Sequence, residues 1–293
     1  MATVGFIGLG NMGGALAANL VQRGHQVLTY DSAGPGRTPA GAAALKGVAE
    51  VARGARTVVL SLPDGPVSEK VAREIRDAAG RRTAFVVDTS TVGVSAACRV
   101  ADLLAERGVG YADAPVSGGV AGARARTLTV MYAAPDDTCA AVEPVLAGLS
   151  DRRRRVGDRP GMAQAVKLAN NFLSATALAA TSEALAFGRA AGLDPAQMMD
   201  VLNASSGRNG ATEDKFPRHI LTGTYDSGFA NSLMAKDVEL YLGAVGAQGG
   251  PDEVGTLIGA LWRRFADAEP GVDFTRVYPF VEAGETATKR SEA

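Results

Sequence analysis

Residues 3–23 read Thr-Val-Gly-Phe-Ile-Gly-Leu-Gly-Asn-Met-Gly-Gly-Ala-Leu-Ala-Ala-Asn-Leu-Val-Gln-Arg. The first five residues predict a short buried strand, and an alanine-rich helix is expected to follow. Between them stands the spacing Gly-x-Gly-x-x-Gly, at Gly8, Gly10 and Gly13. In a strand-to-helix turn, such glycines allow a tight turn, close approach of a pyrophosphate to the backbone, and close packing of helix on strand. Since free N–H groups at the helix start would bind the phosphates, the stretch predicts a dinucleotide-binding domain.

A second predicted strand, 26–30, ends beside an acidic residue, Asp31. A carboxylate at this place suits the adenosine ribose hydroxyls of NAD and repels the 2′-phosphate of NADP. Arg37 follows closely and complicates this assignment, so NAD is predicted and NADP stays an alternative. The residues expected to contact the cofactor here are Gly8, Leu9, Gly10, Asn11, Met12, Gly13 and Asp31.

Strands and helices continue to alternate as far as residue 160. Further strands are predicted at 57–62, 84–88, 109–113 and 127–132, and helices at 66–79, 92–107 and 135–148. A third strand between 32 and 56 is expected to be vestigial, and the basic run 151–156 to be a solvated edge, with phosphate binding as the alternative. Ligands of parallel sheets lie at the carboxyl ends of the strands. Gly8, Asp31, Leu62-Pro63 and Thr89-Ser90-Thr91 are therefore expected to converge.

Beyond residue 160 only helices are predicted, at 161–191, 195–204, 212–221, 232–248 and 252–267. The predicted fold is α/β: a Rossmann-type, doubly wound parallel sheet in residues 1–160, followed by an all-α domain in 161–293. The uncharged stretch 4–22 resembles a signal peptide or a membrane span. No basic segment precedes it and glycines interrupt it, so a buried strand and helix are expected instead.

The composition is that of an ordinary soluble protein of two-domain size, with 46% hydrophobic and 21% charged residues. A net charge of -1 gives no electrostatic reason to expect nucleic acid or an anionic membrane as partner. Two cysteines, with no metal-binding spacing, favour a reducing cytoplasm and predict neither a metal site nor a disulfide framework.

The turn Ser117-Gly118-Gly119 offers a hydroxyl and unhindered backbone N–H groups. Because it follows the end of a predicted strand, we expect it to hold a substrate carboxylate; the alternative is a tight glycine loop without a ligand.

Lys167 and Asn171 lie four residues apart on the first long helix of the second half, and so share one face. Oxidation of an alcohol by hydride transfer needs a group that takes the hydroxyl proton. His25 falls at the end of the sheet away from the cofactor, and His219 reads as structural. Lys167 is therefore the credible general acid/base, with Asn171 orienting it and the substrate hydroxyl. The alternative is a lysine on a solvated helix surface.

Four stretches, in this order, carry a resemblance to a known family: residues 5–13, 113–119 and 167–171, and Phe229 followed by Lys236-Asp237. Over nearly its whole length the chain resembles the β-hydroxyacid dehydrogenases, relatives of 6-phosphogluconate dehydrogenase, and is most similar to 3-hydroxyisobutyrate dehydrogenases. The resemblance implies a homodimer or homotetramer and a reversible oxidation of a small 3-hydroxy acid to its semialdehyde. The alternatives are an NADPH-dependent reductase of small aldehydes (glyoxylate, succinic or tartronate semialdehyde) and a non-catalytic NAD-binding dimer.

Carried over by position, the resemblance makes Lys167 the catalytic lysine. The residues that it implies for substrate binding are Ser117, Gly118, Gly119 and Asn171, with Asp237 next to them. Those that it implies for lining the cofactor are Leu62, Pro63, Thr91 and Lys236. Two positions depart from the family pattern, because Arg126 and Ala163 stand where glycines are usual. Arg126 would bring a large cation near a loop that handles acids, which puts the size or charge of the substrate in doubt.

Overall fold

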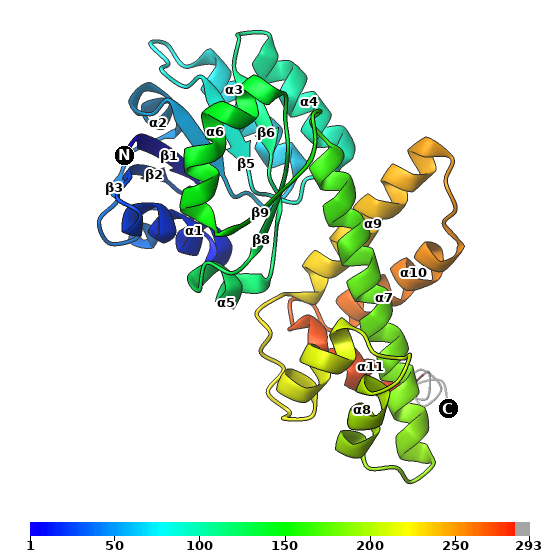
Figure 1. The fold of residues 1–293 in the computed structure, drawn as a ribbon. Helices are drawn as coiled ribbons and strands as arrows, with labels where there is room; N and C mark the ends of the chain where they lie inside the picture. The colour runs from blue at the N-terminus through cyan, green and yellow to red at the C-terminus, as the bar shows by residue number, and fades with distance from the viewer. Residues whose placement is uncertain (285–293) are drawn as a thin grey trace. The chain divides into compact units, whose positions relative to one another are not determined.

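The computed structural model describes residues 1–284, which fall into two compact units (Figure 1). The first unit is Met1–Leu168 and the second begins at Ala169. Helix α7 (Met162–Ala190) starts in the first unit and continues into the second. The two units are described in turn.

The first unit is built on one sheet, in the order β3-β2-β1-β4-β5-β6-β8-β7, with β9 paired to β8. The strands from β1 to β6 pair in parallel, whereas β8 runs antiparallel to β6 and β7. This confirms the predicted Rossmann-type sheet, and the two-residue β3 is as vestigial as expected. The strands are β1 (Thr3–Ile7), β2 (Gln26–Tyr30), β3 (Ala43–Ala44), β4 (Thr57–Leu60), β5 (Phe85–Asp88), β6 (Gly110–Asp113), β7 (Val116–Ser117), β8 (Thr129–Ala133) and β9 (Arg152–Gly157).

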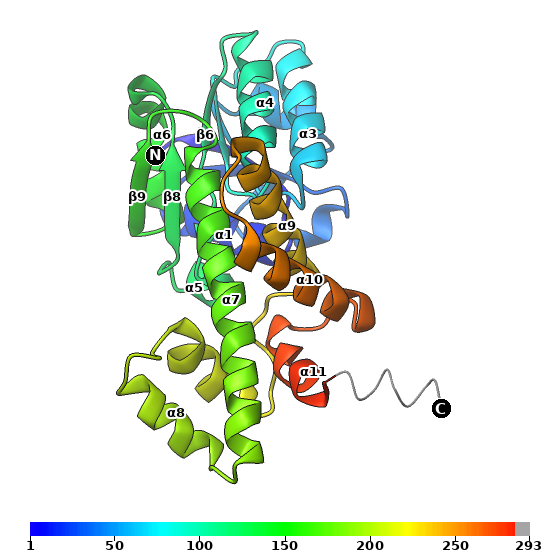
Figure 2. The same cartoon turned by 90° about the vertical axis from the view of Figure 1, so that its right-hand side faces the viewer.

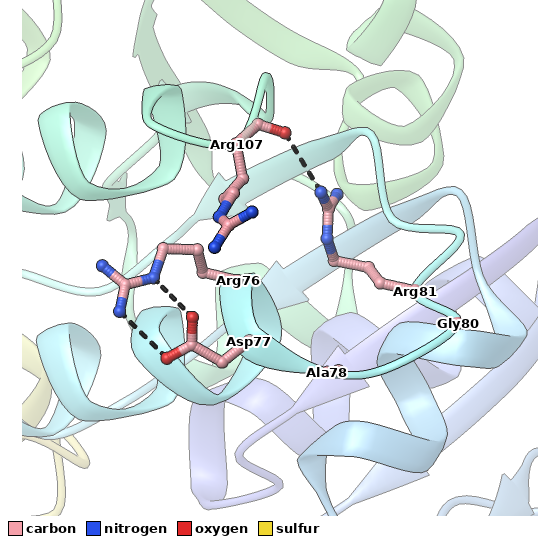
Figure 3. A pocket seen from close by; sticks show the side chains of 6 residues that line it. All are labelled: Arg76, Asp77, Ala78, Gly80, Arg81 and Arg107. Carbon is pink, nitrogen blue, oxygen red and sulfur yellow. Dashed lines mark hydrogen bonds and ion pairs between the residues drawn. The ribbon is translucent and has the colours of Figure 1, made fainter.

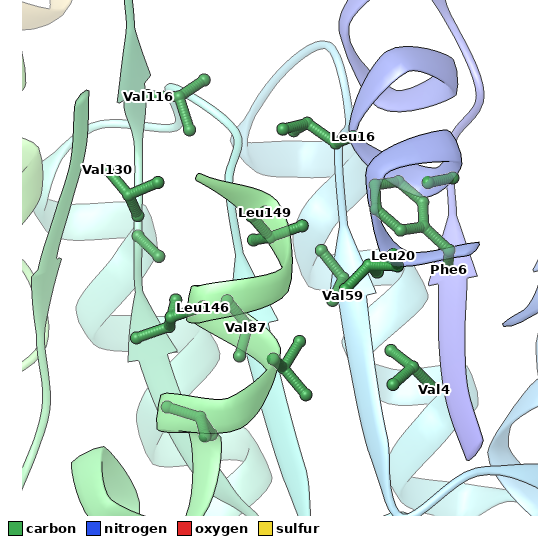
Figure 4. Packing of buried hydrophobic residues seen from close by; sticks show 14 of the residues in the cluster. Val4, Phe6, Leu16, Leu20, Val59, Val87, Val116, Val130, Leu146 and Leu149 are labelled. Carbon is green, nitrogen blue, oxygen red and sulfur yellow. The ribbon is translucent and has the colours of Figure 1, made fainter. Parts of the chain in front are cut away.

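Helices cover both faces of this sheet, which explains why its central strands are apolar on both sides. One face carries α1 (Asn11–Gln22), α5 (Gly119–Arg124) and α6 (Asp136–Leu149). Figure 4 shows apolar side chains of α1 and α6 packed on the strands. The other face carries α2 (Val48–Gly54), α3 (Gly65–Asp77) and α4 (Val94–Ala105). Figure 2 shows α3 and α4 side by side, in agreement with their contacts. Burial of each large apolar side chain contributes about 1.5–3 kcal/mol to the stability of the fold. The two helix layers therefore hold the strands, and with them the strand ends, in place.

The second unit contains helices and, within 169–284, no strand longer than an isolated bridge between Ala230 and Asp273. Its helices after α7 are α8 (Pro195–Asn203), the π-type helix η2 (Ala211–Ile220), α9 (Asn231–Gln248), α10 (Glu253–Ala268), η3 (Phe274–Arg276) and α11 (Val277–Ala283). They enclose a core that includes the fully buried Trp262, Phe216 and Phe265. None of the helices in residues 1–284 has the length and apolarity that crossing a membrane requires.

Several short elements escape prediction: η1 (Pro35–Arg37), α2, β7, α5, β9, η3 and α11. The arginine run 152–155 is the most instructive case, because it forms β9, the outer strand beside β8. Arg153 and Arg155 reach Glu143 and Asp136 of α6, at 3.1 and 2.5 Å. Since every side chain in the run is charged, no apolar alternation marks it as a strand.

Candidate active site

The glycine turn between β1 and α1 is shaped by close backbone contacts. Gly8 has φ of +91°, and a Cβ there would lie 2.2 Å from the Ser61 carbonyl oxygen. A Cβ on Gly13 would lie 2.0 Å from the carbonyl oxygen of Gly8. Gly10, by contrast, has no atom within 4 Å of a Cβ position, and it precedes α1 without a side-chain cap. The start of α1 is therefore open where a pyrophosphate would bind.

Asp31 follows β2 and is held next to this turn. Its carboxylate accepts the Leu9 N–H at 2.6 Å and the Ala33 N–H at 2.8 Å. The Arg37 guanidinium lies 3.7 Å from the same carboxylate. The side chain of Asp31 is only 7% exposed, so its charge faces the start of α1 rather than bulk water. A fixed carboxylate at this point can accept hydrogen bonds from ribose hydroxyls.

The ends of β4 and β5 are joined by hydrogen bonds beside the glycine turn. The Leu62 N–H donates to Ser90 Oγ at 2.7 Å, and Thr89 Oγ1 donates to the Leu60 carbonyl at 2.7 Å. Because β4 lies between β1 and β5, the loops carrying Leu62-Pro63 and Thr91 leave the same edge of the sheet as the glycine turn. The expected convergence of these strand ends is present within the first unit.

The loop Ser117-Gly118-Gly119 connects the two-residue strand β7 to α5. Gly118 and Gly119 have φ of 129° and 68°, a region that glycine adopts more readily than any other residue. A Cβ on Gly118 would also lie 3.0 Å from Leu128 Cα. The glycines are therefore required by the backbone itself, and they leave the N–H groups at the start of α5 unhindered.

Arg126 has a structural role that its position in the sequence does not suggest. Its φ is 60°, which explains why a glycine is usual there. Its guanidinium donates to the carbonyls of Ala147 and Gly148 at the end of α6 and pairs with Asp151 at 3.0 Å. These bonds hold the cation at the C-terminal end of a helix, where a positive charge is favourable. The expected effect of this cation on substrate size or charge therefore loses its basis.

Ala163, the second departure from the family pattern, is accommodated without strain. It is fully buried in a small cluster with Met131 and Ala133. The residue that needs to be glycine is Gly161, with φ of +91° and with Cys98 Sγ 3.1 Å from its Cβ position.

Lys167 lies in the second turn of α7 and is 8% exposed. Charged side chains are rarely this buried unless they are paired or used. The start of α7 is bound to the strand ends, because the Gln164 N–H donates to Asp113 Oδ2 at 3.0 Å. The structure thus contradicts the alternative of a solvated surface lysine.

Asn171, one turn after Lys167 on α7, belongs to the second unit and is 5% exposed. Its Nδ2 donates to Asp237 Oδ2 at 2.5 Å, and its Oδ1 accepts from Asn170. Asp237 Oδ1 lies 3.2 Å from Lys236 Nζ, in an ion pair without hydrogen-bond alignment. Asn171, Lys236 and Asp237 are therefore brought together, with the amide of Asn171 oriented by Asp237.

Two carboxyl groups are buried at adjacent strand ends, Asp88 on β5 opposite Asp113 on β6. Burial raises the pKa of Asp88, and it raises the pKa of Asp113 to about 7. Asp88 accepts the Ser90 N–H, and Asp113 accepts that of Gln164. These acids and Gln164 were not predicted as part of the site. Their signal is a polar residue in an otherwise apolar strand end or helix start.

The two histidines lie one in each unit. His25 precedes β2, at the amino end of the strand, and burial lowers its pKa. His219 lies in η2 of the second unit, where Nδ1 is 2.7 Å from Asp226. His25 therefore lies at the edge of the sheet opposite the glycine turn.

A cavity of about 540 Å³ lies at the opposite edge of the sheet (Figure 3). Its lining comes from the end of α3 and from the turns that precede β5 and β6, namely Arg76, Asp77, Ala78, Gly80, Arg81 and Arg107. The cavity is therefore at the amino ends of the strands, and its lining does not include the glycine turn between β1 and α1. Within residues 1–284 no group of histidine, cysteine and acidic side chains could hold a metal ion.

Comparisons with known proteins agree with this architecture. The NAD-binding domain of 6-phosphogluconate dehydrogenase matches residues 3–157, and the family described as "NAD-binding of NADP-dependent 3-hydroxyisobutyrate dehydrogenase" matches 161–281. The chain therefore belongs to the β-hydroxyacid dehydrogenases, enzymes that bind NAD(P) and oxidise the CH–OH group of hydroxy acids.

Within that family the chain stands close to the 3-hydroxyisobutyrate dehydrogenases. It is 36% identical to the Pseudomonas aeruginosa enzyme, over 94% of this chain and 97% of the relative. It is 38% identical to 2-(hydroxymethyl)glutarate dehydrogenase of Eubacterium barkeri, over 82% of this chain and 81% of the relative. The solved structure of Mycobacterium tuberculosis 3-hydroxyisobutyrate dehydrogenase with L-serine superimposes with a TM-score of 0.88, at 32% identity, over 96% and 99% of the two chains.

Proposed function

We propose that the protein catalyses the reversible, NAD-dependent oxidation of a small 3-hydroxy acid, similar to 3-hydroxyisobutyrate, to its semialdehyde. The observation that carries the proposal is the buried Lys167, on a helix whose start is bonded to the strand ends of a dinucleotide-binding sheet. In this scheme residues 1–160 bind the cofactor and 161–293 supply substrate and subunit contacts.

The chemistry follows from these residues. The nicotinamide, when bound, accepts the hydride from the carbon that bears the hydroxyl group. Lys167, as the neutral amine, takes the hydroxyl proton, so that the C–H and O–H bonds break and a carbonyl forms. In the reverse direction the Lys167 ammonium returns that proton. Asn171, held by Asp237, donates its remaining N–H to the substrate oxygen.

The substrate acid is assigned to the turn Ser117-Gly118-Gly119, whose hydroxyl and N–H groups suit a carboxylate. The names of the relatives support a 3-hydroxy acid, because 3-hydroxyisobutyrate, 2-(hydroxymethyl)glutarate and L-serine all carry a hydroxymethyl group on the carbon next to the carboxylate.

We assign the cofactor as NAD. The residues assigned to contact it are Gly8, Leu9, Gly10, Asn11, Met12, Gly13, Leu62, Pro63, Thr91 and Lys236. The fixed carboxylate of Asp31 favours ribose hydroxyls over a 2′-phosphate. The rival, an NADPH-linked aldehyde reductase, draws on Arg37 beside Asp31 and on the NADP in the description of the second family match. Initial rates with NAD and NADP test the choice. We expect at least a tenfold preference for NAD, reduced at least tenfold in Asp31→Ser; a wild-type preference for NADP would overturn it.

The test of the lysine is Lys167→Ala. General acid/base catalysis contributes about 10²–10⁴-fold, so turnover of 3-hydroxyisobutyrate should fall by that factor while NAD affinity is unchanged. Lys70→Ala, on an exposed part of α3, is the matched control and should retain full turnover. Near-normal turnover in Lys167→Ala would sink the assignment.

We further propose a cytoplasmic homodimer or homotetramer. The second unit exposes large apolar side chains, including Leu173 (64%), Phe187 (76%) and Leu257 (73%), which a subunit contact would cover. The two cysteines are unpaired, as in a reducing compartment. Light scattering behind a sizing column should give twice or four times 30.0 kDa. A monomer would contradict the assembly but not the reaction.

A further inference from the structure

The side chain of Gln164 occupies an unusual place at the start of α7. It is fully buried, and its amide makes three hydrogen bonds to the loop that follows β5. Oε1 accepts the N–H groups of Val92 and Gly93, at 3.0 and 3.1 Å, and Nε2 donates to the Ser90 carbonyl at 3.0 Å. One side chain therefore satisfies three backbone groups, and no apolar residue of the same volume can do so.

The same helical turn is held from a second strand. The Gln164 N–H donates to Asp113 Oδ2, and Asp113 is the last residue of β6. Asp113 also lies opposite Asp88 in the β5–β6 register. The first turn of α7 is thus bonded both to the end of β6 and to the loop after β5.

This network continues to the loops expected to line the cofactor. Ser90, whose carbonyl accepts from Gln164, also accepts the Leu62 N–H through its Oγ. The Ser90 N–H donates to Asp88 Oδ1 at 3.0 Å. A continuous set of buried hydrogen bonds therefore leads from Leu62 through Ser90 to Gln164, all within the first unit.

Lys167 follows Gln164 by three residues on α7. Side chains with this spacing are neighbours on one helix face, so a displacement of the first turn moves Lys167 with it. Proton transfer requires heavy atoms within about 2.6–3.2 Å, and a misplacement of about 1 Å can reduce a rate by about 10²-fold. Hydrogen bonds can hold the first turn of α7 in one position and orientation. The Gln164 side chain supplies such bonds, to Ser90, Val92 and Gly93.

We propose that Gln164 is the positioning residue of the active site: its side-chain amide fixes Lys167 relative to the strand ends that receive the nicotinamide. This inference rests on the proposed function, in which Lys167 takes the hydroxyl proton of the substrate. The side-chain amide of Gln164 is used in bonds to the backbone of Ser90, Val92 and Gly93, so Gln164 acts through the lysine.

Gln164→Met tests the idea, because it keeps the length of the side chain and removes its three bonds. We expect kcat for 3-hydroxyisobutyrate to fall at least tenfold, with KM for NAD changed less than about threefold. Gln164→Glu keeps the acceptor for Val92 and Gly93 and loses the donor to Ser90, so its kcat should be intermediate. Met131→Ala is the control, since it loosens the apolar cluster around Ala163 without touching the bonds, and should keep kcat.

A double-mutant cycle separates positioning from other roles. In Lys167→Ala there is no lysine to position, so adding Gln164→Met should reduce kcat less than about threefold further. Independent effects, in which Gln164→Met costs the same factor with and without Lys167, would overturn the proposal. So would a normal kcat in Gln164→Met, or equal losses in Gln164→Met and Met131→Ala. If Gln164→Met does not fold, the cycle is run with Gln164→Glu.

The two proposals fail in different ways. Near-normal turnover in Lys167→Ala would remove the proposed function, and this inference with it. A large loss in Lys167→Ala, together with an unaffected Gln164→Met, would remove only the role of Gln164.

Discussion

Replacing Asp113 by asparagine should remove a specific part of the pH dependence of stability. The side chain is fully buried; one carboxylate oxygen accepts the Gln164 N–H and the other has no hydrogen-bond partner. Burial raises the pKa of Asp113 from 3.8 to about 7. The folded protein therefore keeps a proton that the unfolded chain releases as the pH rises above about 4. The stability that this proton contributes is complete below that pH and is lost as the pH rises through 7.

The size of the effect follows from the same values. Each pH unit between the two pKa values corresponds to about 1.4 kcal/mol. Between pH 5 and pH 8 the Asp113 carboxyl should therefore reduce the free energy of unfolding by about 2–3 kcal/mol. Asp113→Asn keeps an oxygen for the Gln164 N–H and carries no charge at any pH. The difference between wild type and variant should thus change by that amount over the range.

Urea unfolding at several pH values, followed by far-UV circular dichroism, measures this difference. The sole tryptophan, Trp262, lies in the second unit, so its fluorescence follows that unit separately. Asp102→Asn, at an exposed position on α4, is the control and should run parallel to wild type. If the curves of Asp113→Asn and wild type also stay parallel between pH 5 and pH 8, the reasoning is wrong.

Four further variants test other parts of the structure. Gly13→Ala forces a Cβ against the Gly8 carbonyl, so it should cost about 1–3 kcal/mol of stability and also weaken NAD binding. Gly10→Ala has open space around its Cβ, so it should lose NAD affinity at unchanged stability. Urea titrations measure the stability and cofactor titrations the affinity, and tight NAD binding by Gly10→Ala would contradict the pyrophosphate assignment. Asn19→Leu leaves the buried Leu149 carbonyl without its donor, while the Ala123 carbonyl keeps the bond from the Arg126 N–H. The free energy of unfolding should fall by about 1–3 kcal/mol, and a loss below about 0.5 kcal/mol would contradict this. Phe216→Ala should cost about 3–5 kcal/mol in the second unit, visible as an earlier fluorescence transition, and an unchanged midpoint would refute it.

The main elements of the fold could be predicted because their residues repeat with a period. The strands β1 and β2 and the long helix α7 show continuous apolar runs or helical spacing, and their bounds agree with the structure to within a residue or two. The loop strand β7 and the helix α5 span only two and six residues, which is too short for a period to appear. Their form depends on pairing with β8 and on packing against α1.

The site divides in the same way. Glycines, Asp31 and Lys167 are visible in sequence because each has a role tied to its residue type. The sequence predicts that Arg126 affects the substrate, whereas its backbone conformation and its bonds to the end of α6 give it a structural role. In the sequence Gln164 is only one of several polar residues of α7, since the partners of its side chain lie more than 70 residues away in the chain.

The arginine strand β9 has a consequence for solubility. Within the described residues it pairs with β8 alone, so its other side is an open sheet edge. Such edges can pair with another chain and begin aggregation, and charged side chains along them oppose this. Arg152 and Arg154 are exposed there, and a second copy approaching this edge would bring more arginines against them. The four arginines thus make β9 hard to recognise in the sequence, and they also oppose edge-to-edge pairing between the sheets of two copies.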